Sequence, residues 1–397
     1  MPAPPGPRNI LFLNHNSRGV GTFYRCWHLA RQLARSGLRV TLVTGSPNRR
    51  ILARSSSEDG VLITETPNLL TNMYALGSGY GAIGIPYRVV YSLRQRFDLI
   101  HAFDHKPNVL LPAVLRSKMK ETPLVADWSD WWGQTTDGTG LQERKAKPVV
   151  RLETFMEEYI HTEADWVTTI STGLRQRAVS LGIPPDRISC IPSGAPDDLI
   201  MPLDKTHCRA ELQISPGTFL LGYVGIGIED LEMMADALLL LRRLRKNLKL
   251  GIVGPVETVT QLNEPALREG ITWFGRIPFH RLSLYLGACD AFVLPMRDST
   301  VNRNRWPNKF GDYIAAGRPV LCSNVGDVAR IVESERCGLV WNDGSDLISA
   351  IESLVDDPGL ANELGARARY VAEHQLSWEA LSRQFVAVYR NMWGGAT

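Results

Sequence analysis

The sequence predicts two α/β domains, each built on a parallel sheet that helices cover on both faces. The chain has 397 residues, more than the ~250–300 at which a single core usually stops growing. Apolar runs of strand length alternate with helical patterns, which indicates parallel strands joined by helices. An irregular polar segment over residues 192–217 divides this alternation into two series of nearly equal length.

In the first series, an apolar strand at residues 9–13 leads into a glycine turn and an amphipathic helix over 23–36. Gly37 ends that helix. The further strands of this series are predicted at residues 40–44, 98–102, 123–127, 166–170 and 188–191. Continuous apolar runs of this kind favour a sheet that is buried on both faces.

The second series repeats the pattern. Its strands are predicted at residues 219–224, 248–253, 271–274, 291–294 and 320–322, and one of its helices at 231–246. A further helix starts at or just after Pro307, because proline is not accommodated in a helix interior. The chain ends in an amphipathic helix over residues 378–393, whose apolar side chains fall at helical spacing.

Composition excludes several classes of protein. A net charge of +3 is too small to indicate a nucleic-acid partner. The six cysteines form no CxxC pair and no Cys/His ligand spacing, which fits a reducing compartment and argues against a structural zinc site. No apolar run approaches the length of a membrane span. We therefore expect a cytoplasmic protein.

Basic residues nevertheless cluster in two places. The clusters are Arg88, Arg94 and Arg96, then Arg116, Lys118 and Lys120. Most runs of this kind are solvated helix faces. Peripheral contact with the inner membrane surface is the alternative.

The helix after Pro307 carries the most informative pair of side chains. Lys309 and Asp312 are three residues apart, so they share one helical face near the helix N-terminus. This combination of groups suits a sugar nucleotide. The ammonium and the backbone N–H groups would bind phosphate, and the carboxylate would accept hydrogen bonds from the ribose hydroxyls. A capped surface helix of any α/β protein is the alternative.

Two segments after first-series strands supply candidates for chemistry. His101, Asp104 and His105 could polarise a sugar or orient an acceptor hydroxyl, although a histidine there can also be structural. The acid and aromatic loop 127–132 could bind an acceptor or donor sugar, or its tryptophans could plug a domain edge. Its predicted binding residues are Asp127, Trp128, Asp130 and Trp131. The chain contains no Walker A loop, HExxH motif or Ser-His-Asp order.

A series of short motifs runs along most of the chain, at residues 19–21, 98–101, 191–194, 252–254, 273–276, 289–295 and 317–320, ending at Gly326. In this order they resemble the retaining glycosyltransferases of the GT-B fold, family-4 type. The resemblance implies two Rossmann-like doubly wound domains facing across a cleft, with the final helix crossing back to the first. We therefore expect an acceptor-side domain of residues 1–195 plus 378–397 and a donor-side domain of residues 196–377.

The sequence also departs from that family's pattern. The donor signature of the family has two glutamates, and here their positions carry Asn304 and Asp312. The usual basic phosphate pair falls around Ile226 and Asp230, so Lys309 is the leading substitute, as in a Pro-x-Lys variant of the fold. Arg276, Arg303 and Arg305 are reserves. The predicted donor-binding residues are Gly19, Val20, Gly21, Gly225, Arg276, Asn304, Asn308, Lys309 and Asp312.

The reaction that the resemblance implies is transfer of a sugar from a nucleotide-diphosphate sugar to a hydroxyl acceptor with retention of configuration. The acceptor is a glycan, a lipid-linked glycan or a small molecule. No metal and no cofactor besides the donor are expected, and Asp127 and Asp130 are not spaced as a metal-binding DxD motif. Two alternatives remain. One is a phosphorylase or epimerase of the same fold. The other is a non-catalytic sugar-binding subunit, which is suggested by Asn304 in place of a glutamate and by the missing basic pair.

Overall fold

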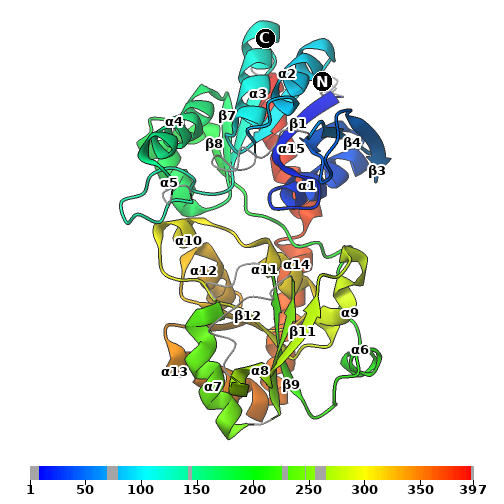
Figure 1. The fold of residues 1–397 in the computed structure, drawn as a ribbon, viewed down its shortest axis with the longest axis vertical. Helices are drawn as coiled ribbons and strands as arrows, with labels where there is room; N and C mark the ends of the chain where they lie inside the picture. The colour runs from blue at the N-terminus through cyan, green and yellow to red at the C-terminus, as the bar shows by residue number, and fades with distance from the viewer. Residues whose placement is uncertain are drawn as a thin grey trace. The chain divides into compact units, whose positions relative to one another are not determined.

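The computed structural model describes residues 9–68, 79–141, 145–225, 231–245, 247–254 and 265–394. Contacts between residues divide the chain into two compact units (Figure 1). Unit 1 comprises Met1–Ser193, Ser299–Trp306 and Trp378–Thr397, and unit 2 comprises Gly194–Asp298 and Pro307–Ser377. The short segment Ser299–Trp306 thus belongs to unit 1, whereas the sequence had assigned it to the second domain.

Unit 1 is built on an eight-stranded sheet in the order β3-β4-β2-β1-β5-β6-β7-β8. Its strands are β1 (Asn9–Ser17), β2 (Arg39–Gly45), β3 (Arg54–Glu58), β4 (Val61–Thr66), β5 (Leu99–Phe103), β6 (Leu124–Trp128), β7 (Trp166–Thr169) and β8 (Ile188–Cys190). Every neighbouring pair is parallel except β3 and β4.

The β3–β4 hairpin is an addition to what the sequence predicted. Its turn residues Asp59 and Gly60 have φ angles of 49° and 80°. Two positive φ angles in succession are typical of the tight hairpin turns that Asp-Gly favours. The strand residues of β3 are polar and mostly exposed, so they lack the apolar run that marked the other strands.

The helices of unit 1 form two layers. They are α1 (Phe23–Arg35), α2 (Gly84–Arg94), α3 (Pro107–Lys120), α4 (Lys147–Glu163), α5 (Thr172–Ser180), α10 (Thr300–Asn304) and α15 (Trp378–Gly394). The step from β1 to β2 and the step from β5 to β6 run in opposite directions across the sheet, so right-handed crossovers place α1 and α3 on opposite faces. The last helix, α15, packs against α1, and Trp378 stacks on His28 with ring centroids 5.7 Å apart.

Unit 2 is built on a six-stranded parallel sheet in the order β11-β10-β9-β12-β13-β14. Its strands are β9 (Phe219–Val224), β10 (Leu248–Val253), β11 (Ile271–Gly275), β12 (Ala291–Leu294), β13 (Val320–Ser323) and β14 (Gly338–Trp341). Its helices are α6 (Lys205–Glu211), α7 (Ala235–Leu244), α8 (Pro265–Arg268), α9 (Leu282–Gly287), α11 (Asn308–Ala315), α12 (Gly326–Ser334), α13 (Gly344–Asp356) and α14 (Pro358–His374). Strand β14 was not predicted.

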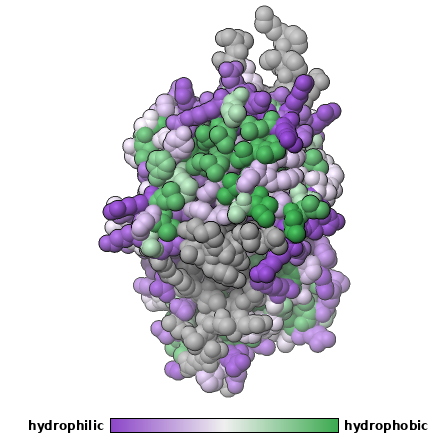
Figure 2. Space-filling view, turned by 45° about the horizontal axis from the view of Figure 1, so that its top comes forward, coloured by the Kyte–Doolittle hydropathy of each residue, from purple (hydrophilic) through white to green (hydrophobic). Residues whose placement is uncertain are grey.

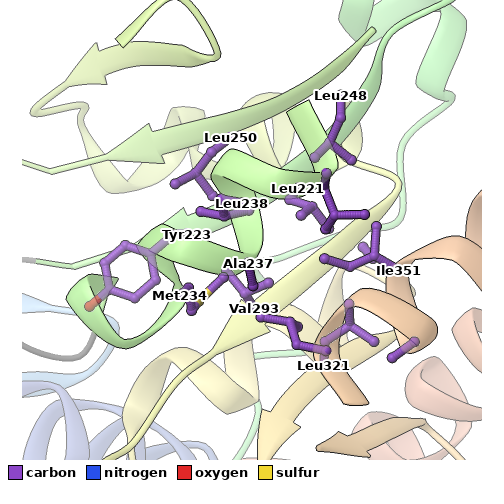
Figure 3. Close-up of a cluster of buried hydrophobic side chains, with 14 of the residues drawn as sticks. Leu221, Tyr223, Met234, Ala237, Leu238, Leu248, Leu250, Val293, Leu321 and Ile351 are labelled. Atoms are coloured by element: carbon purple, nitrogen blue, oxygen red, sulfur yellow. The ribbon is translucent and has the colours of Figure 1, made fainter. Parts of the chain in front are cut away.

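The core of unit 2 lies between this sheet and the helices that flank it. Leu221, Leu250 and Val293 from neighbouring strands meet Leu238 of α7 and Ile351 of α13, and all five are almost fully buried (Figure 3). Burying apolar area in this way stabilises a sheet. It also holds the carboxyl ends of the strands in fixed positions.

Both sheets contain a point where the strand order reverses, between β1 and β5 in unit 1 and between β9 and β12 in unit 2. Ligands of doubly wound sheets bind at the carboxyl ends of the strands beside such a point. The two sheets, with eight and six strands, confirm the predicted fold class of paired Rossmann-like domains.

Candidate functional site

In unit 2, the Lys309 ammonium lies at the carboxyl end of β9. Its Nζ is 2.8 Å from the Tyr223 hydroxyl and 4.1 Å from the centre of that ring. The predicted helix start is confirmed, because α11 begins at Asn308, directly after Pro307. Lys309 therefore stands in the first turn of a helix, where backbone N–H groups and the helix dipole also attract an anion.

Glycines leave room for this ammonium. Gly225 has a φ angle of 147°, and a Cβ atom on it would lie 2.9 Å from Lys309 Nζ. On the neighbouring strand, Gly254 has a φ angle of 148°, and a Cβ on it would lie 2.0 Å from the Gly225 carbonyl oxygen. A side chain at either position would obstruct the strand ends. Gly225 thus has a local reason to be glycine, beside the predicted donor role.

Asp312 lies one turn further along α11. Burial raises the pKa of its carboxyl to about 7, and the Lys309 ammonium opposes that rise. Within the described part of the chain, no hydrogen bond reaches the Asp312 carboxylate. A carboxyl that is held partly buried without a hydrogen-bond donor costs stability, which is a common property of functional groups.

Other residues predicted for this site are less constrained. Asn308 and Arg276 are exposed, and Arg276 directly follows β11. Ile226 and Asp230, where the family's basic pair would fall, lie outside the described residues.

Asn304 lies in unit 1, unlike Lys309 and Asp312. It ends the short helix α10, its backbone carbonyl accepts a 2.7 Å hydrogen bond from Ser171 Oγ, and its side chain is buried. Arg305 and Asp130 also belong to unit 1, and Arg305 Nε lies 3.8 Å from Asp130 Oδ1. Arg303 is exposed. These contacts explain Asn304 and Arg305 by packing within unit 1.

The glycine loop of unit 1 connects β1 to α1. Gly19 and Gly21 have φ angles of 80° and 57°, and a Cβ on Gly21 would lie 2.7 Å from Asn16 Nδ2. Gly19, Val20 and Gly21 are all exposed. Among the described residues, the backbone N–H groups of Gly19 and Gly21 have no hydrogen-bond acceptor, so the loop can offer both to an anion.

His101 lies inside the sheet, not at its edge. Its side chain is fully buried, its Nδ1 lies 2.8 Å from the Tyr389 hydroxyl, and its ring stacks on Phe103 at 4.2 Å. Burial lowers the pKa of His101 to about 3, against a smaller opposing effect of Asp127. The imidazole is therefore neutral and enclosed by the core, as expected for a histidine with a structural role.

Asp104 follows β5 at the point where the strand order reverses. Its φ angle is 64°, which is strained for a non-glycine residue. Its carboxylate contacts His15 Nδ1 at 3.0 Å, Thr22 Oγ1 at 3.1 Å and Trp132 Nε1 at 3.3 Å. Burial alone would raise the pKa of Asp104, but the His15 hydrogen bond and charge outweigh it and lower the pKa to about 2.

A second group of contacts surrounds His105. Glu153 Oε2 lies 2.7 Å from His105 Nε2 and 2.5 Å from Lys106 Nζ, and Tyr80 donates a 2.6 Å hydrogen bond to Oε1. The Lys106 ammonium stands 4.3 Å from the centre of the Trp132 ring. Trp132 therefore joins the Asp104 group to the Glu153 group, and together they form the polar cluster of unit 1.

Some histidine nitrogens of this cluster are buried without a hydrogen bond. Within the described residues, His15 Nε2 and His105 Nδ1 are unpaired, and His15 Nδ1 also lacks a hydrogen bond of regular geometry although the Asp104 carboxylate lies 3.0 Å away. A buried unpaired nitrogen costs free energy, so it calls for an explanation. A hydroxyl-bearing ligand at this edge of the sheet would supply the missing partner.

Asp127, predicted to bind an acceptor, is an internal ion-pair partner. Arg25 donates to both of its carboxylate oxygens, at 2.8 Å and 2.7 Å, and both side chains are almost completely buried. Thr168 and Ser129 hydroxyls donate further bonds of 2.7 Å and 2.8 Å. Each oxygen of the Asp127 carboxylate thus already accepts two hydrogen bonds from unit 1, which leaves no acceptor position for a sugar hydroxyl.

The predicted tryptophan platform divides in the same way. Trp128 is fully buried, stacks on His161 at 4.0 Å and donates to Glu157, so its ring offers no face to a sugar. Trp131 is partly exposed, with the Arg177 guanidinium 4.1 Å from its ring centre. Asp130 is partly exposed, and burial raises the pKa of its carboxyl to about 7 against the opposing Arg305 charge.

Sequence reasoning missed His15, Lys106, Trp132 and Glu153. His15 and Lys106 come shortly after the predicted strands 9–13 and 98–102, so the rule that singled out Asp104 could also have found them, although β1 itself extends past His15 to Ser17. Trp132 stood in the predicted loop but was not chosen. Glu153 sits in the middle of α4, and no local pattern distinguishes it from a solvated helix residue.

Comparison with known proteins assigns the two halves of the chain. The family model "Glycosyl transferase 4-like domain" matches residues 20–194, and "Glycosyl transferases group 1" matches residues 218–357. D-inositol 3-phosphate glycosyltransferase of Nocardia farcinica is 28% identical over 232 residues, 53% of this chain and 49% of that protein. Alpha-maltose-1-phosphate synthase of Mycolicibacterium smegmatis is 23% identical over 265 residues, 61% of this chain and 67% of that protein. The aligned part spans about half the length of the first of these relatives.

Solved structures match over nearly the whole chain. Sucrose-phosphate synthase from Thermosynechococcus elongatus has a TM-score of 0.75 at 18% identity and covers 98% of this chain and 99% of its own. Anabaena HepE, solved in complex with UDP-glucose, has a TM-score of 0.72 at 15% identity, covering 96% and 99%. At these identities the likeness shows the fold alone. With both family models matched in order, the chain belongs to the family-4 type of glycosyltransferases of the GT-B fold.

Proposed function

We propose that this chain transfers a sugar from a nucleotide-diphosphate sugar to a hydroxyl acceptor with retention of the anomeric configuration. The observation that carries the proposal is the position of Lys309 beside Gly225 and Asp312 at the carboxyl end of β9. This arrangement offers a cation and a helix N-terminus to the diphosphate and a carboxylate to the ribose hydroxyls. Unit 2 is therefore the donor side in this proposal.

On the acceptor side, the polar cluster of unit 1 holds the groups that suit hydroxyl recognition. Asp104 is ionised, and His105 and Lys106 share Glu153. We assign positioning of the sugar or acceptor to Asp104 and His105. His101, Asp127 and Trp128 are explained by the core of unit 1, so we do not carry them into the site.

The proposed chemistry follows from the family. The bond between the anomeric carbon and the diphosphate oxygen breaks, and the acceptor oxygen bonds to that carbon on the same face. The acceptor's proton passes to the departing diphosphate oxygen. What unit 2 contributes is electrostatic: Lys309 and the start of α11 can stabilise the negative charge that develops on the leaving group.

A thermal-shift screen with UDP, GDP, ADP and dTDP tests the proposal. We expect one nucleotide to raise the melting temperature, since a ligand at about 100 times its dissociation constant stabilises a fold by roughly 2.7 kcal/mol. The shift should persist in EDTA, because among the described residues no group of three or more His, Cys, Asp or Glu side chains is placed to hold a metal ion. No shift with any nucleotide would favour a non-catalytic sugar-binding subunit, and a shift lost in EDTA and restored by Mn²⁺ would show a metal requirement.

Asp312→Asn is expected to weaken ribonucleotide binding while leaving the fold at least as stable. The folded-state pKa of about 7 lies above the usual value of 3.8. The folded chain therefore holds an extra proton between these values, and the Asp312 contribution to stability falls as the pH rises through about 7. Replacing the carboxyl by an amide should remove that loss at pH 8.

Calorimetric titration at pH 8 with the best ribonucleotide and its 2′,3′-dideoxy analogue measures the effect. We expect the variant to lose affinity for the ribonucleotide and to bind the dideoxy analogue as the parent does. Unchanged ribonucleotide affinity would remove Asp312 from the donor site. Thermal melts of both proteins at pH 8 provide the stability control.

A further inference from the structure

Exposed apolar side chains gather on three neighbouring helices of unit 1, and we call this the α2–α4 surface. Its members are Val90, Leu111, Leu115, Met119, Leu152 and Phe155, with exposed fractions between 38% and 62%. Figure 2 shows apolar side chains gathered into a patch that hydrophilic side chains border. Contiguous apolar patches on a soluble protein usually mark an interaction site.

The three helices present these side chains on one continuous face. Helix α2 packs against α3, and α3 against α4. Lys118 of α3 lies 2.6 Å from Glu163 Oε2 and 3.4 Å from the Tyr159 hydroxyl, both on α4. Phe155 and Tyr159 stack one turn apart at 5.6 Å. These contacts tie the helices together, so the apolar residues form one surface and not isolated exposed positions.

The basic residues that the sequence grouped here divide into two kinds. Arg88 and Arg116 are almost completely buried and donate to backbone carbonyls, Arg88 to Asn14 and Asn108 and Arg116 to Gln95 and Phe97. These hydrogen bonds link segments of unit 1 to one another, so neither guanidinium is available to a partner. Arg94, Arg96 and Lys120 remain exposed.

These exposed cations border the apolar residues. Arg94 follows Val90 by one helical turn, Lys120 follows Met119 directly, and Arg151 directly precedes Leu152. Lys147, at the start of α4, is also exposed, and within the described residues none of these cations forms an ion pair. The acidic groups on the same helices are largely engaged, since Glu163 pairs with Lys118 and Glu158 pairs with Arg177.

We infer that the α2–α4 surface docks on a lipid bilayer with anionic headgroups. Apolar side chains would enter the boundary between headgroups and acyl chains while Arg and Lys bind lipid phosphates, and stable peripheral binding needs such a pair of signals. Within the described residues no helix is long and apolar enough to cross a bilayer, so this contact would be peripheral. A symmetric second copy fits less well, because it would bring the two basic margins together.

Co-sedimentation with vesicles tests the inference without any sugar substrate, so it stands or falls independently of the proposed function. We expect binding to phosphatidylcholine vesicles that contain phosphatidylglycerol, weakened by salt, and little binding to phosphatidylcholine alone. Met119→Ser with Phe155→Ser should reduce partitioning at least roughly tenfold, since both side chains are largely exposed and would lose apolar burial in the bilayer. Ile51→Ser with Leu52→Ser is the matched control, because these side chains are at least as exposed but lie outside the surface.

The charge contribution is tested with a second pair of variants. Arg94→Gln and Lys120→Gln should each weaken binding to anionic vesicles roughly fivefold and leave the fold unchanged. Arg39→Gln and Arg54→Gln, on exposed strand positions, serve as controls. Absence of vesicle binding by the parent, or equal binding to both vesicle types, would overturn the inference. So would a dimer in the ultracentrifuge that Met119→Ser with Phe155→Ser converts to a monomer without effect on vesicles.

Discussion

Asp127→Asn is expected to destabilise unit 1 by about 3–5 kcal/mol, the usual result of removing one partner of a buried ion pair. Arg25 binds both oxygens of Asp127 and also donates to the Ile191 carbonyl at 2.9 Å. The variant would leave the guanidinium buried without its counter-charge. In a domain of this size the melting temperature should fall by roughly 6–20 °C.

The pH dependence gives an independent readout of the same pair. Burial would raise the pKa of Asp127, but the Arg25 charge and hydrogen bonds outweigh it, so the pKa lies below the usual 3.8. A depressed folded-state pKa means that the pair's stabilising contribution is complete at neutral pH and is lost as the pH falls below about 4. The difference in melting temperature between parent and variant should therefore shrink in acid.

The same loop contains a matched control. Asp130 lies three residues further on, is partly exposed, and its pKa is raised to about 7 by burial. Asp130→Asn should therefore change the melting temperature little. Arg25→Met with Asp127→Leu should recover part of the lost stability, because an apolar pair needs no desolvation of charge. An Asp127→Asn protein as stable as the parent would contradict this structural role and reopen acceptor binding.

The features that the sequence predicted well are those with a local signal. The helix start after Pro307 was found because proline excludes itself from helix interiors, and the shared face of Lys309 and Asp312 follows from their spacing. Most of the buried strands, though not β4 and β14, were found because each is an apolar run between turns. The β3–β4 hairpin was missed although Asp59-Gly60 marks its turn. Strand β3 is polar and gives no apolar run, and the short apolar start of β4, Val61 to Ile63, was not recognised as a strand.

The features that could not be predicted from the sequence depend on contacts between segments that are distant in the chain. Arg25 and Asp127 are 102 residues apart, and neither has a neighbour that identifies the other. The same holds for His105 and Glu153, which are 48 residues apart. His101 was read as a strand-end residue, but it lies two residues inside the strand, where the ring belongs to the core. The predicted strand 98–102 ends one residue before β5 does, and the longer strand places His101 inside the sheet.

Lys309→Ala is expected to weaken nucleoside-diphosphate binding by roughly 1.5–3 kcal/mol, or about 10- to 150-fold, while nucleoside binding stays nearly unchanged. The reason is that a phosphate oxygen loses a charged hydrogen bond, whereas the base and ribose lose nothing. Lys309 is suited to this role because its ammonium stands 2.8 Å from the Tyr223 hydroxyl at the end of β9, where Gly225 leaves the space open.

Titration of each variant with the nucleotide found by thermal shift and with its nucleoside separates charge from packing. Lys309→Arg should retain part of the affinity for the diphosphate, and Tyr223→Phe should cost less than Lys309→Ala, because it removes only the hydroxyl that holds the ammonium in place. Melting temperatures of the unliganded variants control for the buried Tyr223 ring. Equal losses for nucleotide and nucleoside would mean that Lys309 shapes the start of α11 without contacting phosphate, and the diphosphate would then require another cation, for which the exposed Arg276 at the end of β11 is the next candidate.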